Sequence, residues 1–211
     1  MGHRFAELAF TPTVMAVQEH EGSRDSYRRL EGGEAHHDRL GPAEASFIAA
    51  RDSFYMATVS ATGWPYVQHR GGPPGFLCVL GPTTLAFADY EGNHQMVSTG
   101  NLAGDDRVCL FLMDYPHRRR LKVLGRARVV DARERPELVA QLAASPQARV
   151  ERAVEIAVAS FDWNCPQHIT PRFSAAEVTA VVEPLRRQVA ELQAQLAGAA
   201  VPRTRKETDH A

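Results

Sequence analysis

The stretch that decides the fold runs from residue 54 to residue 127, and residues 70–75 at its centre read Arg-Gly-Gly-Pro-Pro-Gly. Short apolar segments typical of strands lie on both sides of this loop. Proline removes a ladder donor and glycine admits unusual backbone conformations, so the loop cannot continue an ordinary strand. The cation of Arg70 beside a bare, rigid backbone suits an anionic group such as a phosphate. The sequence therefore predicts a sheet interrupted by an anion-binding loop.

The segments around this loop predict a mainly β protein with peripheral helices. Short helices are expected from Gly41, over 93–102 and over 136–144. Many short strands with few helices indicate a closed or nearly closed β-barrel. The expected strands are 54–60, 64–67, 76–80, 84–89, 108–113, 120–130 and 150–161.

The two ends of the chain differ from the barrel region, which we place at residues 41–172. Residues 1–40 are polar and loop-like, which predicts an N-terminal arm that wraps over the barrel. The charged residues 201–211 predict a disordered tail.

Between the barrel and the tail, residues 173–200 predict a C-terminal helix. Ser174 and Glu177 form a capping-box pattern at its start, and Pro184 predicts a break or restart. Apolar residues then recur at alternating spacings of four and three, which makes a heptad seam of fewer than three repeats. We expect this helix to pack on the barrel or on a partner subunit rather than to form a free coiled coil. The seam consists of Val178, Val182, Leu185, Val189, Leu192 and Leu196.

Composition excludes several classes of protein. The chain has 211 residues, 44% of them hydrophobic, and a net charge of -1, which suits one domain and argues against general affinity for nucleic acid or acidic membranes. No window approaches the roughly 18 apolar residues of a membrane-spanning helix, and the N-terminus lacks the apolar region of a secretory signal. No histidine pair has metal-site spacing, so no metal is expected. We predict a cytoplasmic protein whose scattered cysteines are reduced: Cys78, Cys109 and Cys165.

The strand-like segments and the loops between them, in their order along the chain, resemble the pyridoxamine 5′-phosphate oxidase-like superfamily of split-barrel FMN-binding proteins. They resemble an uncharacterised bacterial branch of it in particular. The resemblance implies that residues 41–172 form an FMN-binding split β-barrel. It also implies a homodimer with FMN at the subunit interface, where both chains contribute to each site. The segments that carry the resemblance are 64–76, 89–93, 100–102, 106–108, 119–127 and 162–172.

The resemblance also implies site residues. Arg70 matches an arginine that reaches the FMN phosphate, and Asn93 falls where the family often has an arginine for that phosphate. Arg120 falls where the oxidases have a glutamine near the flavin, and a cation there would stabilise the reduced, anionic flavin. Plainer alternatives stay open: a strand-end charge for Arg70, a helix N-cap for Asn93 and a core position for Trp163. The predicted cofactor-binding residues are Arg70, Gly71, Gly72, Asp89, Asn93, His94, Gln95, Arg118, Arg120 and Trp163.

The sequence departs from the family pattern at the phosphate. Gly75 replaces a lysine, residues 87–88 replace a Tyr-Thr pair, and residues 93–94 replace Arg-Lys. Loop amides and Arg70 must then compensate, together with Arg118 or Arg119.

The family's C-terminal Arg-His-Arg arrangement, which grips pyridoxal phosphate, is missing as well. His168 and Arg172 are similar in position and are weak candidates for binding a substrate anion. True pyridoxamine phosphate oxidase activity is therefore not expected.

The function expected from the resemblance is FMN-dependent oxidoreduction of a small molecule, with NAD(P)H as a possible partner. No side chain stands out as an acid or base, so the catalytic residues stay unassigned. His69, His94 and His168 are candidates for proton delivery because histidine titrates near neutrality. The alternatives are a non-catalytic flavin carrier or sensor, or a split barrel that uses a deazaflavin or heme.

Overall fold

The computed structural model describes residues 2–32, 35–143, 150–163 and 165–199. The chain divides into two compact units, Met1–Ile169 and Thr170–Ala211. None of the helices within the described ranges is both long enough and apolar enough to cross a membrane.

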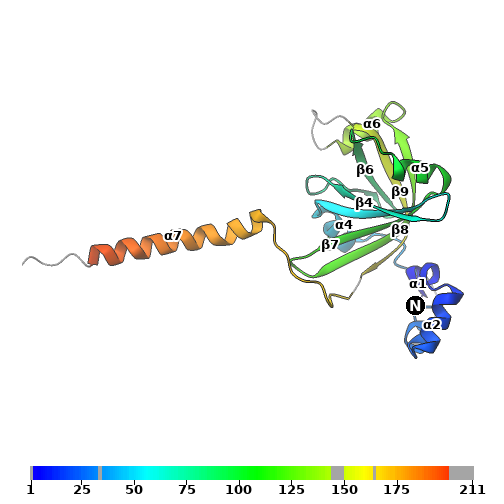
Figure 1. Ribbon diagram of the computed structural model, residues 1–211, viewed down its shortest axis with the longest axis horizontal. Coiled ribbons are helices and arrows are strands. Elements are labelled where there is room, and N and C mark those ends of the chain that lie inside the picture. The colour runs from blue at the N-terminus through cyan, green and yellow to red at the C-terminus, as the bar shows by residue number, and fades with distance from the viewer. Residues whose placement is uncertain (1, 33–34, 144–149, 164, 200–211) are drawn as a thin grey trace, which may run out of the picture. The chain divides into compact units, whose positions relative to one another are not determined.

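The first unit contains a seven-stranded antiparallel sheet with the strand order β4-β3-β7-β8-β9-β6-β5 (Figure 1). Each of the seven strands corresponds to a predicted one, and the predicted mainly β fold is confirmed. The strands are β3 (Ser53–Val59), β4 (Pro65–Gly71), β5 (Cys78–Gly81), β6 (Thr84–Tyr90), β7 (Arg107–Asp114), β8 (Arg119–Asp131) and β9 (Val150–Trp163).

The sheet curls around one apolar core. Alternate residues of each strand face this core because strand side chains point to opposite faces in turn. Phe54 of β3 stacks on Phe76 at 5.5 Å and meets the ring of Phe87 on β6 edge-on at 5.3 Å. Since β3 and β6 lie toward opposite ends of the strand order, these contacts bring the two ends of the sheet together. The edges β4 and β5 remain separate in the strand order, so the barrel is a split one.

The bend of the long pair β8–β9 depends on Gly125. The register of the pair shifts between Leu124 and Gly125. A Cβ at Gly125 would lie 2.7 Å from the carbonyl oxygen of Ala157, which is closer than real Cβ contacts. Only glycine permits this approach, and such bulges bend a strand and increase its twist.

Helix α4 (Pro42–Ala49) fastens the start of the barrel to β9. Oε2 of Glu44 accepts a hydrogen bond from the Gly41 N–H at 2.9 Å, and Oε1 accepts one from Trp163 Nε1 at 2.7 Å. Burial alone would raise the pKa of Glu44, but these hydrogen bonds outweigh it, and the pKa lies below its usual value. Glu44 therefore stays ionised and holds Trp163 in place.

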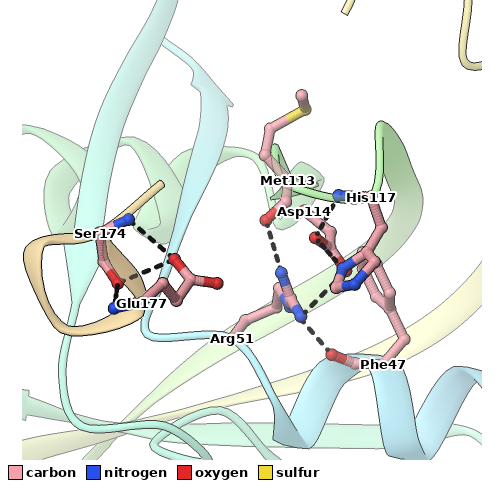
Figure 2. Close-up of polar contacts among 7 residues, drawn as sticks. All are labelled: Phe47, Arg51, Met113, Asp114, His117, Ser174 and Glu177. Atoms are coloured by element: carbon pink, nitrogen blue, oxygen red, sulfur yellow. Dashed lines mark hydrogen bonds and ion pairs between the residues drawn. The ribbon is translucent and has the colours of Figure 1, made fainter. Parts of the chain in front are cut away.

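Arg51, just after α4, joins this helix to β7. Its side chain donates to the carbonyl oxygens of Phe47 at 3.2 Å and Met113 at 3.0 Å, and it pairs with Asp114 at 3.3 Å (Figure 2). Burial would raise the pKa of Asp114, but hydrogen bonds from His117 and the charge of Arg51 lower it overall. A second, smaller core lies under α6 (Pro136–Leu142), whose Leu138 and Leu142 pack with Ala86, Ala88, Val130 and Ala153.

The expectation of a loop-like N-terminal arm is wrong. The arm contains β1 (Gly2–His3), α1 (Arg4–Ala9), α2 (Pro12–His20), α3 (Arg24–Arg28) and β2 (Ala35–His36). Thr11 caps α2 and Pro12 begins it, which are ordinary start signals. Buried Arg24 forms two hydrogen bonds of 2.6 Å to Glu31, so the polar residues of the arm find partners within it.

Helix α5 (Val97–Gly104) begins four residues later than the predicted 93–102. His94 and Met96 both have φ 56°, in the left-handed region, so a right-handed helix cannot run through them. Asn93 does not cap the helix; its Oδ1 accepts a hydrogen bond from the Gln95 N–H at 3.2 Å and closes a turn.

Helix α7 (Ala175–Ala199) forms most of the described part of the second unit, and its predicted capping box is confirmed. Glu177 Oε2 accepts from the Ser174 N–H at 2.7 Å, and Ser174 Oγ accepts from the Glu177 N–H at 3.2 Å (Figure 2). The predicted break at Pro184 is wrong, because the helix continues through it and loses only the bond that this nitrogen cannot donate. The predicted disordered tail, 201–211, lies outside the described residues.

The N-terminal arm is joined to β9 through a pair of stacked histidines. The rings of His3 and His37 lie 4.0 Å apart and nearly parallel, and His37 meets Phe161 edge-on at 5.2 Å. Burial, followed by the proximity of His37, lowers the pKa of His3; Lys122 acts in the same direction, and Asp162, 3.7 Å from His3 Nε2, opposes it. His3 is therefore held neutral.

We expect the arm to loosen as the solution is acidified. The pKa of His3 is lower in the folded chain than its unfolded value of 6.5, so its contribution to stability is complete above that value and is lost as pH falls through the folded pKa. Hydrogen exchange of residues 2–9 at about pH 7.5 and about pH 5.5 should show a larger loss of protection in the wild type than in His3→Phe, which keeps a ring and cannot titrate. An equal loss in both proteins would contradict the prediction.

Candidate functional site

A pocket lies where the ends of β4, β6 and β9 meet the start of α5. It holds about 70 Å³, the space of roughly two or three water molecules, which suits a phosphate-sized group and not a whole flavin. Its lining contains Gln68, Arg70, Asp89, Tyr90, Gly92, Asn93, His94, Gln95, Met96, Val97, Ser98, Thr99 and Arg152. The structure thus brings together five of the ten predicted cofactor-binding residues: Arg70, Asp89, Asn93, His94 and Gln95.

The centre of the pocket is a carboxylate shared by two arginines. Buried Asp89 accepts a hydrogen bond from Arg70 Nη1 at 2.8 Å and another from Arg152 Nε at 3.1 Å. Asp89 and Arg152 are direct cross-strand partners in the β6–β9 register. The lining therefore contains two guanidinium groups and one carboxylate, and Arg152 also donates to Glu151 at 2.9 Å.

Arg70, which lines this pocket, has one hydrogen-bond donor that is not used. Its Nε is buried and has no hydrogen-bond partner among the described residues. A buried donor without a partner costs about 1–3 kcal/mol, so an acceptor supplied by a ligand would be stabilising. The guanidinium also lies over the ring of Phe87 at 5.7 Å, which fixes its position against the core.

The start of α5 adds donors of a second kind. The first N–H groups of a helix have no acceptor within the helix, and the helix dipole favours an anion there. Two bonds hold α5 in place: Ser98 Oγ donates to Gln68 Oε1 at 2.8 Å, and Asn101 Nδ2 donates to Thr58 Oγ1 at 3.0 Å. Arginines and helix amides thus face one small space.

A group of potential metal ligands lies beside the pocket. Glu91, His94 and Glu151 each place one ligand atom within 4.8 Å of the others, and His94 Nε2 lies 3.6 Å from Glu151 Oε1. Glu91 and His94 are exposed, and Glu151 is also bonded to Arg152 at 2.9 Å. We assign no metal to them.

The glycine loop has a packing role. Gly71 and Gly72 follow Arg70 but do not line the pocket, so their contact with a cofactor stays a prediction. A Cβ at Gly72 would lie 2.6 Å from Cγ of Phe76, and the Gly72 N–H donates to the carbonyl oxygen of Asp52 at 2.9 Å. The loop seats Phe76 in the core and ends β4 just after Arg70.

Two further predicted residues, Arg118 and Trp163, line a second recess with Arg119. The Arg119 guanidinium lies over the Trp163 ring at 4.6 Å. Arg118 has φ 53° and precedes β8, so it does not belong to the strand that carries Arg120. Arg120 lies over the Phe111 ring at 5.9 Å, and its buried Nε has no partner among the described residues.

The remaining candidates lie elsewhere. His69 is on β4, with its ring edge-on to Tyr55 at 5.5 Å. His168 has φ 62° in the segment after β9, whereas Arg172 belongs to the second unit. The structure adds Arg152, Ser98 and Gln68, which the sequence analysis missed. The alternation of β9 could have placed Arg152 on one face, but only the register with β6 sets it opposite Asp89.

Comparison with known proteins assigns the family. A family model described as pyridoxamine 5′-phosphate oxidase matches residues 40–164, more than half of the chain. The chain belongs to this family. No curated protein matches it.

Three solved structures illustrate what the chain is similar to. HupZ from Group A Streptococcus is 13% identical with a TM-score of 0.50, and the match covers 64% of this chain and 99% of that one. An FMN-binding protein from Syntrophomonas wolfei is 11% identical with a TM-score of 0.46, covering 72% and 97%. A Clostridium acetobutylicum protein related to general stress protein 26 is 12% identical with a TM-score of 0.42, covering 63% and 92%. At these identities the likeness concerns the fold alone.

Substitution of Gly72 tests the packing role of the loop. Gly72→Ala should destabilise the protein by about 1–3 kcal/mol, because the added methyl group overlaps the ring of Phe76. Gly81→Ala, whose new methyl group would meet nothing within 4 Å, is the matched control. Urea unfolding measures both variants, and equal stability of the two would disprove the assignment.

Proposed function

We propose that the protein binds FMN and acts as a flavin-dependent oxidoreductase on a small molecule. Family membership over residues 40–164 supports a flavin site in the barrel. The observation that carries the proposal is the pocket lined by Arg70, Arg152 and the start of α5, because Arg70 also has a buried Nε with no hydrogen-bond partner among the described residues.

The residues of this pocket fit a phosphate monoester. Arg70 and Arg152 supply guanidinium groups, and α5 supplies main-chain amides. In this proposal Arg152 of β9 is the second cation, which compensates for the absence of the family's lysine and Arg-Lys pair. Bound FMN would supply hydride or electron transfer through its ring, and the chain would bind, orient and tune it.

We further propose that the site is completed in a homodimer. The predicted residues fall into separate groups within one chain, with Arg70 in the pocket, Trp163 in the second recess and Arg120 against Phe111. A second copy would allow groups from two chains to serve one flavin.

The sheet surface beside Arg120 supports such an interface. Tyr55, Trp64 and Val67 are exposed by 41%, 75% and 59%. Tyr55 pairs with Phe111 across β3 and β7, so this apolar surface continues toward the strand that carries Arg120. A cluster of exposed apolar side chains of this kind is typical of a protein interface.

The reduced state of the cysteines is consistent with a cytoplasmic location, which we also propose. Cys78 and Cys109 are free thiols. Burial raises the pKa values of Cys78 and Cys109, which makes these two thiols poor nucleophiles, and we give them no catalytic role.

The role of Arg70 is tested with two flavins that differ in one group. Arg70→Ala should weaken FMN binding by ~2 kcal/mol, about 30-fold, and leave riboflavin binding nearly unchanged, because riboflavin lacks the phosphate. Arg126→Ala, which removes an exposed arginine paired with Asp106, is the control. Quenching of flavin fluorescence gives the affinities. Unchanged FMN affinity, or an equal loss for both flavins, would refute phosphate binding by Arg70.

Turnover separates an enzyme from a flavin carrier or sensor. The FMN-loaded protein should oxidise NADH or NADPH faster than an equal concentration of free FMN, because a positioned flavin accepts hydride more readily than one in solution. The rate is followed by nicotinamide absorbance, and the chromophore released from fresh protein is identified by mass. A rate equal to that of free FMN would favour the carrier, and a deazaflavin or heme mass would replace FMN as the cofactor.

A further inference from the structure

Helix α7 carries a narrow apolar seam along its whole length. Written as a heptad, Val182, Val189 and Leu196 occupy the a positions, and Val178, Leu185 and Leu192 occupy the d positions. Five of the six side chains are exposed by 47–70%, and Val182 is half-buried. The family match ends at residue 164 and does not include this helix.

The residues that flank the seam indicate whether a sheet or another helix can pack on it. The g positions hold Val181, Gln188 and Gln195, none of which is charged. A helix that packs on a sheet has a broad apolar stripe with a period of 3.6 residues, whereas a strict a/d seam with a period of 3.5 fits one other helix. The charged side chains lie at b, c, e and f positions: Glu177, Glu183, Arg186, Arg187 and Glu191.

We propose that α7 pairs with α7 of a second copy of this chain as a parallel, in-register, two-stranded coiled coil. Valine at two of three a positions with leucine at two of three d positions favours two parallel strands. The single proline inside the helix, Pro184, is at a c position and points away from the seam.

Charge complementarity distinguishes the parallel arrangement from the antiparallel one. In parallel strands each g residue faces the e residue of the next heptad, which sets Gln188 against Gln193 and Val181 against Arg186, with no like charges opposed. In a fully overlapping antiparallel pair, e positions face e positions, and Arg186 would lie beside its own copy. The pairing of Arg186 with Glu183 at 2.9 Å on its own helix leaves the parallel seam undisturbed.

Cysteine cross-linking in the full-length chain tests both the pairing and its direction. V178C and L196C place a thiol at either end of the seam, in a background with the three native cysteines changed to alanine. In a parallel pair each new thiol faces its own copy. In an antiparallel pair each new thiol is separated from its own copy by most of the helix, ~27 Å for 18 residues. A194C, at an outward f position of the same turn as Leu196, is the matched control.

The expected result is a covalent dimer from V178C alone and from L196C alone, formed at least about tenfold faster than from A194C in a glutathione buffer. Adding L185D and L192D to L196C should abolish the difference, with circular dichroism confirming that the barrel remains folded. Cross-linking no faster than that of A194C, or only between V178C and L196C in a mixture, would overturn the proposal. The readout does not depend on flavin, so it stands or falls separately from the proposed function.

Discussion

The close approach of β8 and β9 at Gly125 is the constraint on which the rest of the barrel depends. These two long strands run through the middle of the sheet, and the bulge at Gly125 bends them so that the sheet can curl. Strand β9 then reaches three separate parts of the molecule. Arg152 meets Asp89 in the pocket, Phe161 meets the N-terminal arm, and Trp163 meets Glu44 of α4. One strand thus sets the positions of the pocket, the arm and the first helix of the barrel.

The pocket differs from a plain cluster of positive charge. Asp89 neutralises part of the charge of Arg70 and Arg152 and holds both guanidinium groups in fixed geometry. Fixed donors bind an anion without first losing side-chain freedom, which favours binding. In the function that we propose, Arg152 would take the place of the lysine or Arg-Lys pair of the family pattern, from a different strand.

The elements that depend on local sequence patterns were predicted correctly. Alternation of apolar residues located all seven strands, and Ser174 with Glu177 located the start of α7. The sequence also predicted Arg70 and Asp89 as site residues, because both lie at strand ends beside unusual loops. Arg152 was not predicted as a site residue, because its pairing with Asp89 is set by strand register, which is a property of the whole sheet. The start of α5 was misplaced because the left-handed backbone of His94 and Met96 is rare for residues other than glycine. The packing role of Gly72 was not predicted, because its closeness to Phe76 appears only in three dimensions.

The carboxylate of Asp89 also affects how the chain folds when no cofactor is bound. Two half-buried guanidinium groups close together without a counterion would oppose folding. With Asp89 between them, the barrel carries its own counterion and can close during synthesis, independently of the supply of ligand.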